Sequence, residues 1–244
     1  MSDSPVALVT GSSSGIGAQV ARRLVADGYR VVVNSVRSVD EGRALAAELG
    51  DEVAHYIQGD VAVIEDAQRL VAETVQRFGR LDVLVNNAGT TVRIPHADLE
   101  SATPEIFRRL FDVNVVGAWQ VIVAAVPHLR DAGAGCIVNV ASLAGVRPTG
   151  SSVPYAVSKA ALNHLTVLLA NALGPDIRVN AVAPGLIDTP WTADWDDIRG
   201  AVQAIAPLKR SGQPDDVAEV VLTLVRASYV TGQIWAVDGG MSMR

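Results

Sequence analysis

The sequence is poor in the residues that cross-link chains or bind metals. It has one cysteine, Cys136, and four scattered histidines, His55, His96, His128 and His164. A single cysteine excludes an intrachain disulfide, and histidines without ligand spacing argue against a metal site. We interpret Cys136, within the apolar run CIVNVA, as a core residue of a protein in a reducing compartment.

Basic charge and long apolar segments are also scarce. Lys and Arg total 20 against 26 Asp and Glu, a formal net charge of −6, so the basic face typical of nucleic-acid binders is not expected. The start, MSDSPVALVTGSSSG, has no basic region followed by a long apolar stretch, which argues against a signal peptide. No run of about eighteen uncharged apolar residues predicts a membrane span. We expect a cytoplasmic protein that binds neither nucleic acid nor membrane.

What the 244 residues do contain is an alternation of strand-like and helix-like patterns. Helical patterns, for example from 16 and from 65, separate short β-branched runs that suit buried parallel strands. This order predicts one α/β domain over 1–244, a Rossmann-type, doubly wound parallel sheet of about seven strands flanked by helices. The segment 188–212 is an insertion before the next helix. The expected strands are 6–10, 30–35, 53–58, 81–88, 136–142, 177–183 and 234–239.

A glycine-rich turn, TGSSSGIG, joins the first strand to the first helix. Gly11, Gly15 and Gly17 would let the backbone approach a pyrophosphate at the helix N-terminus. The spacing is G-x-x-x-G-x-G, and a plain strand–helix turn is the alternative. Its place after a strand, before a helix and near the N-terminus favours dinucleotide binding.

A second short stretch, VPYAVSKAAL, places Tyr155 and Lys159 one helical turn apart. In a helix both side chains project from one face. The pair is either an ordinary amphipathic contact or an acid/base catalyst with a neighbouring ammonium. An unperturbed tyrosine, with a pKa of about 10, is a poor base near neutrality, and a nearby positive charge would lower that pKa.

Taken together, the motifs resemble those of the classical short-chain dehydrogenase/reductase (SDR) family, in particular its 3-oxoacyl-[acyl-carrier-protein] reductases. The resemblance spans the chain, although the segment after Thr189 is compact and LVRASYVTG is short, which bears on subunit packing. The matching motifs are TGSSSGIG, NNAG at 86–89, Asn114 in DVNVVG, Ser142 in NVAS, YAVSK, PGLIDT at 184–189 and VTGQIWAVDGG.

The resemblance implies catalytic roles for Asn114, Ser142, Tyr155 and Lys159. Tyr155 would be the general acid/base, and Lys159 would lower its pKa and hold the nicotinamide ribose. Ser142 would polarise the substrate carbonyl, and Asn114 would anchor a proton-relay water. Without the resemblance, Ser142 could be a helix cap and Asn114 an ordinary polar helix residue.

The resemblance also implies the cofactor contacts, which include Tyr155 and Lys159. At the end of the second strand Ser35 stands where an acidic residue would select NAD, and Arg37 follows. This pair favours NADP(H) over NAD(H), although Arg37 could be a solvated loop charge and Ser14 stands where many NADP-using relatives carry a cation. Asp60 could instead cap the following helix. The other contacts implied are Gly11, Ser13, Ser14, Gly15, Ile16, Gly17, Asp60, Val61, Asn87, Ala88, Gly89, Pro184, Gly185, Ile187 and Thr189.

The residues expected to line the substrate site are mainly apolar, so we expect a hydrophobic carbonyl or alcohol substrate. Arg93 and Arg147 would meet a phosphopantetheine or a carboxylate, or would be solvated. Segment 188–212 would form a substrate lid. The predicted lining residues are Thr90, Val92, Ser142, Leu143, Ala144, Val153, Gly185, Leu186, Trp191 and Trp195.

The leading hypothesis is an EC 1.1.1 oxidoreductase that reduces a ketone, such as a 3-oxoacyl thioester, with NADPH. One alternative is an NAD-dependent dehydrogenase of a steroid or cyclic secondary alcohol. The other is a cofactor-sensing or scaffold protein, against which the intact catalytic residues argue. The family resemblance further implies a homotetramer; the apolar faces of 121–129 and 161–173 fit such contacts, and equally fit a core.

Overall fold

A computed structural model describes residues 4–243 of the chain, and its centre is one sheet of parallel strands. The order is β3-β2-β1-β4-β5-β6-β7, and each neighbouring pair is parallel. The chain winds outward from β1 to β3, returns to β4 and winds outward again, so the crevice between β1 and β4 is the expected ligand site. The strands are β1 Val6–Val9, β2 Arg30–Ser35, β3 Ala54–Gln58, β4 Val83–Asn86, β5 Gly135–Val140, β6 Ile177–Pro184 and β7 Ile234–Val237.

All seven predicted strands are present, and the predicted α/β sheet is confirmed. Most differences lie at the ends, where the chain leaves the ladder earlier than the apolar pattern suggests. β4 ends at Asn86 instead of Ala88, because the Asn87 and Ala88 amides both donate to the Thr10 hydroxyl at 3.1 Å. β5 ends at Val140, which leaves Ser142 in the loop beyond the strand.

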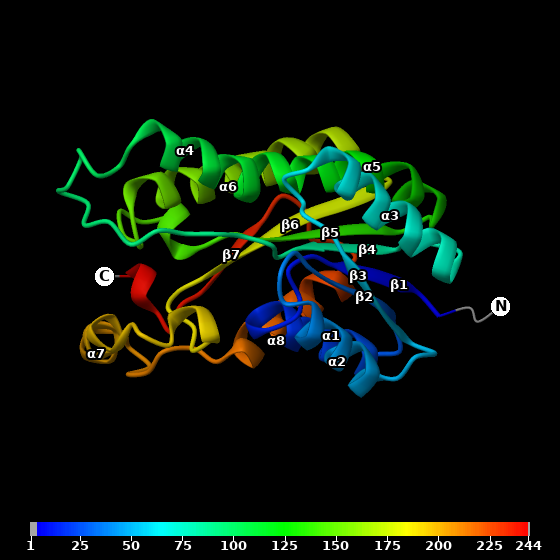
Figure 1. Ribbon diagram of the computed structural model, residues 1–244, viewed down its shortest axis with the longest axis horizontal. Coiled ribbons are helices and arrows are strands. Elements are labelled where there is room, and N and C mark those ends of the chain that lie inside the picture. Colours follow the sequence, from blue (N-terminus) through cyan, green and yellow to red (C-terminus); the bar gives the residue numbers. More distant parts are fainter. Residues whose placement is uncertain (1–3, 244) are drawn as a thin grey trace.

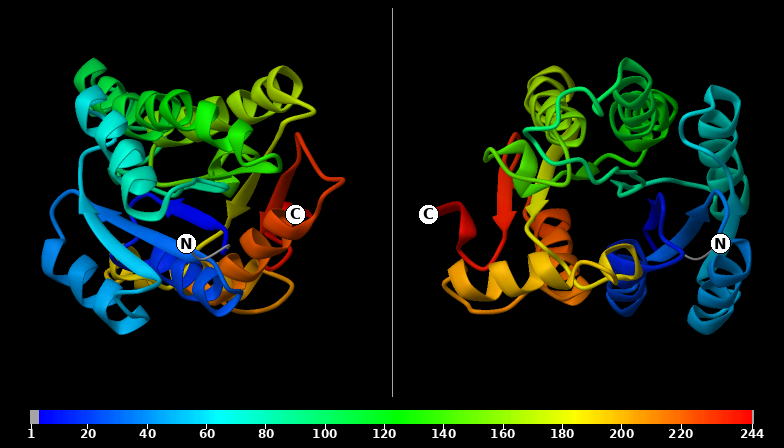
Figure 2. Two further views of the ribbon diagram at one scale, coloured as in Figure 1. Left: turned by 90° about the vertical axis from the view of Figure 1, so that its right-hand side faces the viewer. Right: turned by 60° about the vertical axis from the view of Figure 1, so that its left-hand side comes forward.

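Helices cover both faces of the sheet (Figures 1 and 2). On one face α1, α2 and α8 pack on β-branched residues of β1, β2 and β4, and on the other α3, α5 and α6 pack on the alternate residues. Because both faces are buried, the central strands are apolar throughout, as parallel strands require. The helices are α1 Gly15–Ala26, α2 Val39–Leu49, α3 Ile64–Phe78, α4 Pro104–Phe111, α5 Ala118–Asp131, α6 Val153–Leu173, α7 Asp196–Ile205 and α8 Pro214–Arg226.

The long helix after β4 is not α-helical throughout. A π-helical segment, η1 Asp112–Gly117, joins α4 to α5. Within residues 4–243, the combined helix Pro104–Asp131 is the one helix that length and composition would allow to cross a membrane. In the structure its Val121, Ile122 and Leu129 are buried in the core cluster on the sheet.

Short 3₁₀ turns mark the loops at the carboxyl ends of the strands. They are η2 Leu143–Gly145 after β5, η3 Pro190–Thr192 after β6 and η4 Met241–Met243 after β7. The segment 188–212, which the sequence predicts to be a substrate lid, contains η3 and α7. Both lie at the same side of the molecule as the C-terminus (Figure 1). This edge of the sheet therefore gathers the glycine turn, the NNAG loop, Ser142 and the lid.

Candidate active site

The glycine turn after β1 packs against the loop that follows β4. Gly11 and Gly15 have φ values of +59° and +56°, which favour glycine. A Cβ on Gly11 would lie 2.7 Å from the Ala88 Cα, and the Asn87 side chain donates to the Gly11 carbonyl at 2.7 Å. Ser14 precedes α1 without a side-chain cap. The free N–H groups of the first turn can therefore serve a ligand phosphate.

Asn34 near the end of β2 braces this turn, a role that the sequence interpretation missed. Its Oδ1 accepts from the Gly11 amide at 3.1 Å, and its Nδ2 donates to the carbonyls of Ile57 and Gly59 at 3.1 and 3.0 Å. The signal was available, because an asparagine inside the apolar run RVVVNS must find partners when it is buried.

At the end of β2, Ser35 and Arg37 differ in whether their side chains already have partners within the protein. The Ser35 hydroxyl donates to the Ser38 carbonyl at 2.8 Å and lies 2.9 Å from the Tyr56 hydroxyl, so protein partners already engage it. Arg37 is exposed and has no ion-pair partner among residues 4–243. Of the two predicted phosphate contacts, Arg37 is the one with free donors.

Asp60 does not cap α3, which corrects that alternative. Its Oδ1 accepts from the Ala62 amide at 2.9 Å, while α3 begins only at Ile64 and has no side-chain cap. Asp60 thus closes the turn before the helix. The neighbouring Val61 is buried, and its carbonyl accepts from Gln120 Nε2 at 3.2 Å, which fixes this turn to α5.

Asn114 lies in η1, buried at 1% exposure, and joins the loop after β4 to α6. The Thr90 amide donates to its Oδ1 at 2.8 Å, and its Nδ2 donates to the Thr90 carbonyl and the Ser158 hydroxyl, each at 3.0 Å. Ser158 in turn donates to the Tyr155 carbonyl at 2.7 Å. π-helical turns are frequent at functional sites, and this one places an amide beside the catalytic helix.

Ser142 and Tyr155 meet at the entrance of α6. Ser152 caps that helix by accepting from the Tyr155 amide at 3.3 Å, which fixes the first turn. The Ser142 hydroxyl lies near enough to the Tyr155 phenol to lower its pKa by hydrogen bonding. Ser142 also accepts from the Ala144 amide at 3.1 Å, so the capping role considered for it is present.

Lys159 is buried at 3% exposure, and its Nζ donates to the Val140 carbonyl at 2.9 Å. Burial lowers the pKa of this lysine from 10.5 to about 8. Its Nζ lies 5.9 Å from the centroid of the Tyr155 ring. A Cβ on Gly89 would lie 3.5 Å from this Nζ, so glycine in the NNAG loop keeps the space beside the lysine open.

The expected effect of Lys159 on the tyrosine is not what the structure shows. Burial raises the pKa of Tyr155 above 10, and the hydrogen bond from Ser142 opposes this rise. Lys159 does not oppose this rise; its Nζ donates to the Val140 carbonyl and lies 5.9 Å from the centroid of the Tyr155 ring. Tyr155 is therefore a protonated acid at neutral pH in this arrangement.

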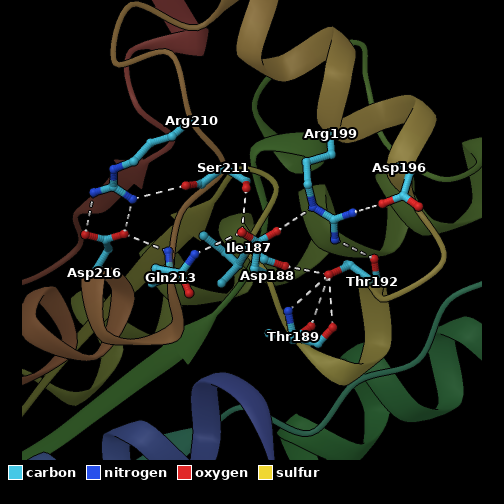
Figure 3. Close-up of polar contacts among 10 residues, drawn as sticks. All are labelled: Ile187, Asp188, Thr189, Thr192, Asp196, Arg199, Arg210, Ser211, Gln213 and Asp216. Atoms are coloured by element: carbon cyan, nitrogen blue, oxygen red, sulfur yellow. Dashed lines mark hydrogen bonds and ion pairs between the residues drawn. The ribbon is translucent and has the colours of Figure 1, made fainter.

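The segment after β6 closes the site from the side of the lid. A Cβ on Gly15 would lie 3.2 Å from the Thr189 methyl group, so this segment reaches the glycine turn. Figure 3 shows Asp188 at the centre of the lid's polar contacts. Burial disfavours its charge, but hydrogen bonds from Arg199, Ser211 and Gln213 outweigh burial and hold its pKa below the usual value.

The predicted substrate residues fall into two groups. Leu143 and Ala144 are buried within η2, whereas Trp191 is 47% exposed in the segment after β6 and Trp195 is partly buried. The sequence left open whether the two arginines meet a ligand or solvent, and the structure shows a third outcome. Arg93 pairs with Asp197 at 3.0 Å, and the Arg147 guanidinium donates twice to the Ser242 carbonyl.

Comparisons with known proteins agree with this geometry. Residues 11–242 match the family model described as "Enoyl-(Acyl carrier protein) reductase". A Streptomyces violaceoruber protein, named as a ketoacyl reductase of the granaticin polyketide synthase, is 59% identical over 98% of this chain and 96% of its own. The chain is a classical short-chain dehydrogenase/reductase.

Solved structures of other SDR proteins share the fold. A short-chain dehydrogenase/reductase from Burkholderia xenovorans is 36% identical, with a TM-score of 0.94 over 100% of both chains. The structure titled "ElxO with NADP Bound" is 29% identical, with a TM-score of 0.89 over 99% of this chain and 100% of that one. This SDR is therefore an oxidoreductase of the NAD(P)-dependent kind.

The structure brings the four predicted catalytic residues of the SDR together, along with the glycine turn, the NNAG loop and the segment after β6. It also adds residues that the motifs did not single out, namely Thr10, Asn34, Ser158, Asp188 and Arg199. Each is a polar residue whose side chain joins two segments near the carboxyl edge of the sheet. Their partners are distant in sequence, so spacing alone could not reveal them.

Proposed function

We propose that this SDR reduces a ketone to a secondary alcohol with NADPH, and that the ketone is a 3-oxoacyl thioester. The observation that carries the proposal is the placement of the Ser142 hydroxyl near the Tyr155 phenol, beside the buried Lys159. A protonated phenol next to a second hydroxyl suits delivery of a proton to a carbonyl oxygen.

The residues present fit a dinucleotide. Glycines line the turn where side chains would fill the cradle, since a Cβ on Gly17 would lie 2.4 Å from the Asn87 side chain and one on Gly11 would strike the Ala88 backbone. When bound, the reduced nicotinamide supplies a hydride. The residues that would hold the cofactor are the predicted ones around the glycine turn, Arg37, Asp60, the NNAG loop, Lys159 and the segment 184–189.

Each catalytic side chain has a separate task in this mechanism. Ser142 donates to the substrate oxygen and polarises the carbonyl, and Tyr155 gives its proton to that oxygen as negative charge develops. Lys159 then returns a proton toward Tyr155, and Asn114, whose amide is held by Thr90 and Ser158, anchors the water that relays it. In the oxidative direction the same phenol acts as the base, after it loses its proton.

Arg37 supports the choice of NADPH. Its free guanidinium lies at the end of β2, where the adenosine ribose of a dinucleotide is bound in this fold, and no acidic side chain takes the place of Ser35. A guanidinium favours a 2′-phosphate by charge and by paired donors. The NADP-bound ElxO structure is consistent with this choice in a related protein.

Two features support a thioester as the substrate. The 59% identical relative carries a ketoacyl reductase name. The lid presents the Trp191 and Trp195 rings and other apolar groups, which suit an acyl chain better than a sugar.

We also propose a homotetramer in the cytoplasm. Along η1, α5 and α6, exposed apolar side chains line faces that the sheet does not cover; they are Val116, Trp119, Val123, Val157, Val167 and Leu168. The edge strand β7 exposes Trp235 in the same way. Light scattering that gives one chain per particle would contradict the tetramer.

The experiment is to follow NADPH oxidation by the purified protein with an acetoacetyl thioester. Three further assays use NADH in place of NADPH, a blank without substrate, and cyclic secondary alcohols with NAD⁺. We expect NADPH-selective reduction, and Arg37→Gln should lower kcat/KM for NADPH about tenfold with little change for NADH. Arg43→Gln, at an exposed arginine in α2, is the control. Equal use of both cofactors by the wild type would reject the role of Arg37.

A further inference from the structure

The lid helix α7 is held in place mainly by polar contacts. Among its residues Asp196–Ile205 only Val202 is buried, and Ile205 at its end is 52% exposed. A helix normally docks through a wide apolar stripe, and most of its stability comes from that packing. With so little buried surface, ion pairs and hydrogen bonds decide where α7 lies.

The first set of contacts, the inner anchor, fixes the base of the lid (Figure 3). Asp188 accepts from Arg199 Nε at 2.8 Å, from the Ser211 hydroxyl at 2.7 Å and from Gln213 Nε2 at 2.9 Å. The Asp188 amide donates to the Gly212 carbonyl at 2.8 Å. One carboxylate thus joins the start, the helix and the end of the lid.

The second set, the outer latch, joins α7 to the loop after β4. It consists of Arg93, Trp195 and Asp197. Arg93 donates to Asp197 Oδ2 at 3.0 Å, and its guanidinium carbon lies 5.4 Å from the centroid of the Trp195 ring. Arg93 therefore holds the first turn of α7 by an ion pair and a cation–π contact at once.

The other end of the latch is firmly fixed beside the catalytic helix. The residue after Arg93, Ile94, is buried, and its amide donates to the Ser151 carbonyl at 2.8 Å. Ser151 directly precedes the cap of α6, four residues before Tyr155. The latch thus connects α7 to the segment just before α6, the helix that carries Tyr155.

We propose that Arg93 is a positioning residue that latches α7 over the substrate, and that Asp197 and Trp195 are its partners on the lid. Its effect on catalysis rests on the carbonyl reduction proposed above. Both latch contacts are solvent-accessible, with Arg93 43% and Asp197 68% exposed. Such contacts form and break readily, so they suit a helix that must admit substrate and release product.

The first test measures the lid directly and needs no substrate. Hydrogen exchange of the α7 amides, 196–205, is compared between wild type, Arg93→Gln and the control Arg108→Gln. Arg108 is a more exposed arginine, at 70% against 43% for Arg93, and it pairs with Glu105 on α4. We expect Arg93→Gln to exchange about three- to tenfold faster in α7 and Arg108→Gln to match the wild type. Equal α7 exchange in all three proteins would overturn the latch.

The second test links the latch to turnover of the acetoacetyl thioester with NADPH. Arg93→Glu should raise KM about three- to tenfold while kcat changes less than twofold, and R93E/D197R should recover most of the loss because the pair is restored with reversed charges. A double variant no better than Arg93→Glu would contradict the pairing. If the wild type does not turn over this thioester, the proposed substrate is wrong, and the exchange measurement still decides on the latch.

Discussion

The catalytic residues and the lid are held in different ways. Asn114, Ser158 and Lys159 are at most 3% exposed, and their polar atoms bond to partners on β5, α6 and the loop after β4. The lid helix has one buried residue, and several of its ion pairs face water. A lost bond in the first region leaves a buried polar atom unpaired, whereas a lost pair in the second is replaced by water. The sheet and its helices therefore hold the proposed catalytic side chains in place. The lid can move to admit substrate without displacing them.

The largest effect on the rate of reduction should come from removing the Tyr155 hydroxyl. Tyr155→Phe removes the proton donor and is expected to lower the rate of reduction by about 10²–10⁴-fold, while NADPH binding persists. Single-turnover kinetics and a fluorescence titration with NADPH measure the two quantities. Tyr229→Phe, at a fully exposed tyrosine, is the control. Retention of full activity in Tyr155→Phe would break the mechanism.

The buried ammonium of Lys159 should lower the free energy of unfolding of the protein. Burial lowers its pKa from 10.5 to about 8, so the unfolded chain binds more protons than the native state between these values. Stability should therefore rise as the pH rises through this window. Lys159→Met removes a buried ammonium and should increase the free energy of unfolding at pH 7 by about 1–3 kcal/mol, with a large loss of activity.

Urea unfolding at pH 7 and at pH 10 measures this difference. The gain in Lys159→Met should shrink at the higher pH, because the wild-type lysine is then neutral in the native state. Lys209→Met, at the exposed lysine of the lid, should change little at either pH. A Lys159→Met protein that is less stable than the wild type at pH 7 would refute the argument.

In the lid, Asp188→Asn should give an intermediate effect. The substitution keeps the shape but removes the charge that holds Arg199, Ser211 and Gln213. Hydrogen bonds to charged groups contribute about 1.5–3 kcal/mol, so we expect KM for the ketone to rise about tenfold. Steady-state kinetics with varied ketone measures this change. An unchanged KM would show that the inner anchor does not control the lid.

The smallest effect should come from the other acidic partner of Arg199. Asp196 also pairs with Arg199, but it is 89% exposed. Asp196→Asn should change KM less than twofold, since exposed pairs contribute little. The same kinetic measurement compares it directly with Asp188→Asn. Equal effects of the two variants would show that burial does not separate the inner anchor from its exposed neighbour.

The sequence predicted much of this architecture because its signals are local. β-Branched runs marked all seven strands. Glycines follow the ends of α1, α2, α3 and α5, where Gly28, Gly50, Gly79 and Gly133 have positive φ. Tyr155 and Lys159 were identifiable because helical spacing places them on one face. The grouping of Asn114 with Ser142 followed from the family resemblance and not from spacing.

The rest depends on contacts between distant parts of the chain. Arg93 and Asp197 are 104 residues apart, and Arg147 and Ser242 are 95 apart, so neither partnership has a sequence signal. The pKa of Tyr155 was predicted in the wrong direction because the sequence shows a neighbouring lysine but not the burial of the phenol. Solvation is a property of the packed molecule, and spacing does not reveal it.

The π-helical segment before α5 determines which side of α5 faces the sheet. An α-helix advances about 100° per residue, and a π turn takes in roughly one additional residue without lengthening the path by a full α turn. α5 is therefore rotated relative to α4, and its Val121, Ile122 and Leu129 face the sheet while Asn114 points inward. Deleting a single residue from 112–117 would turn α5 off its core face, even with every side chain of α5 unchanged. The fold therefore constrains the number of residues in this segment as well as the identity of Asn114.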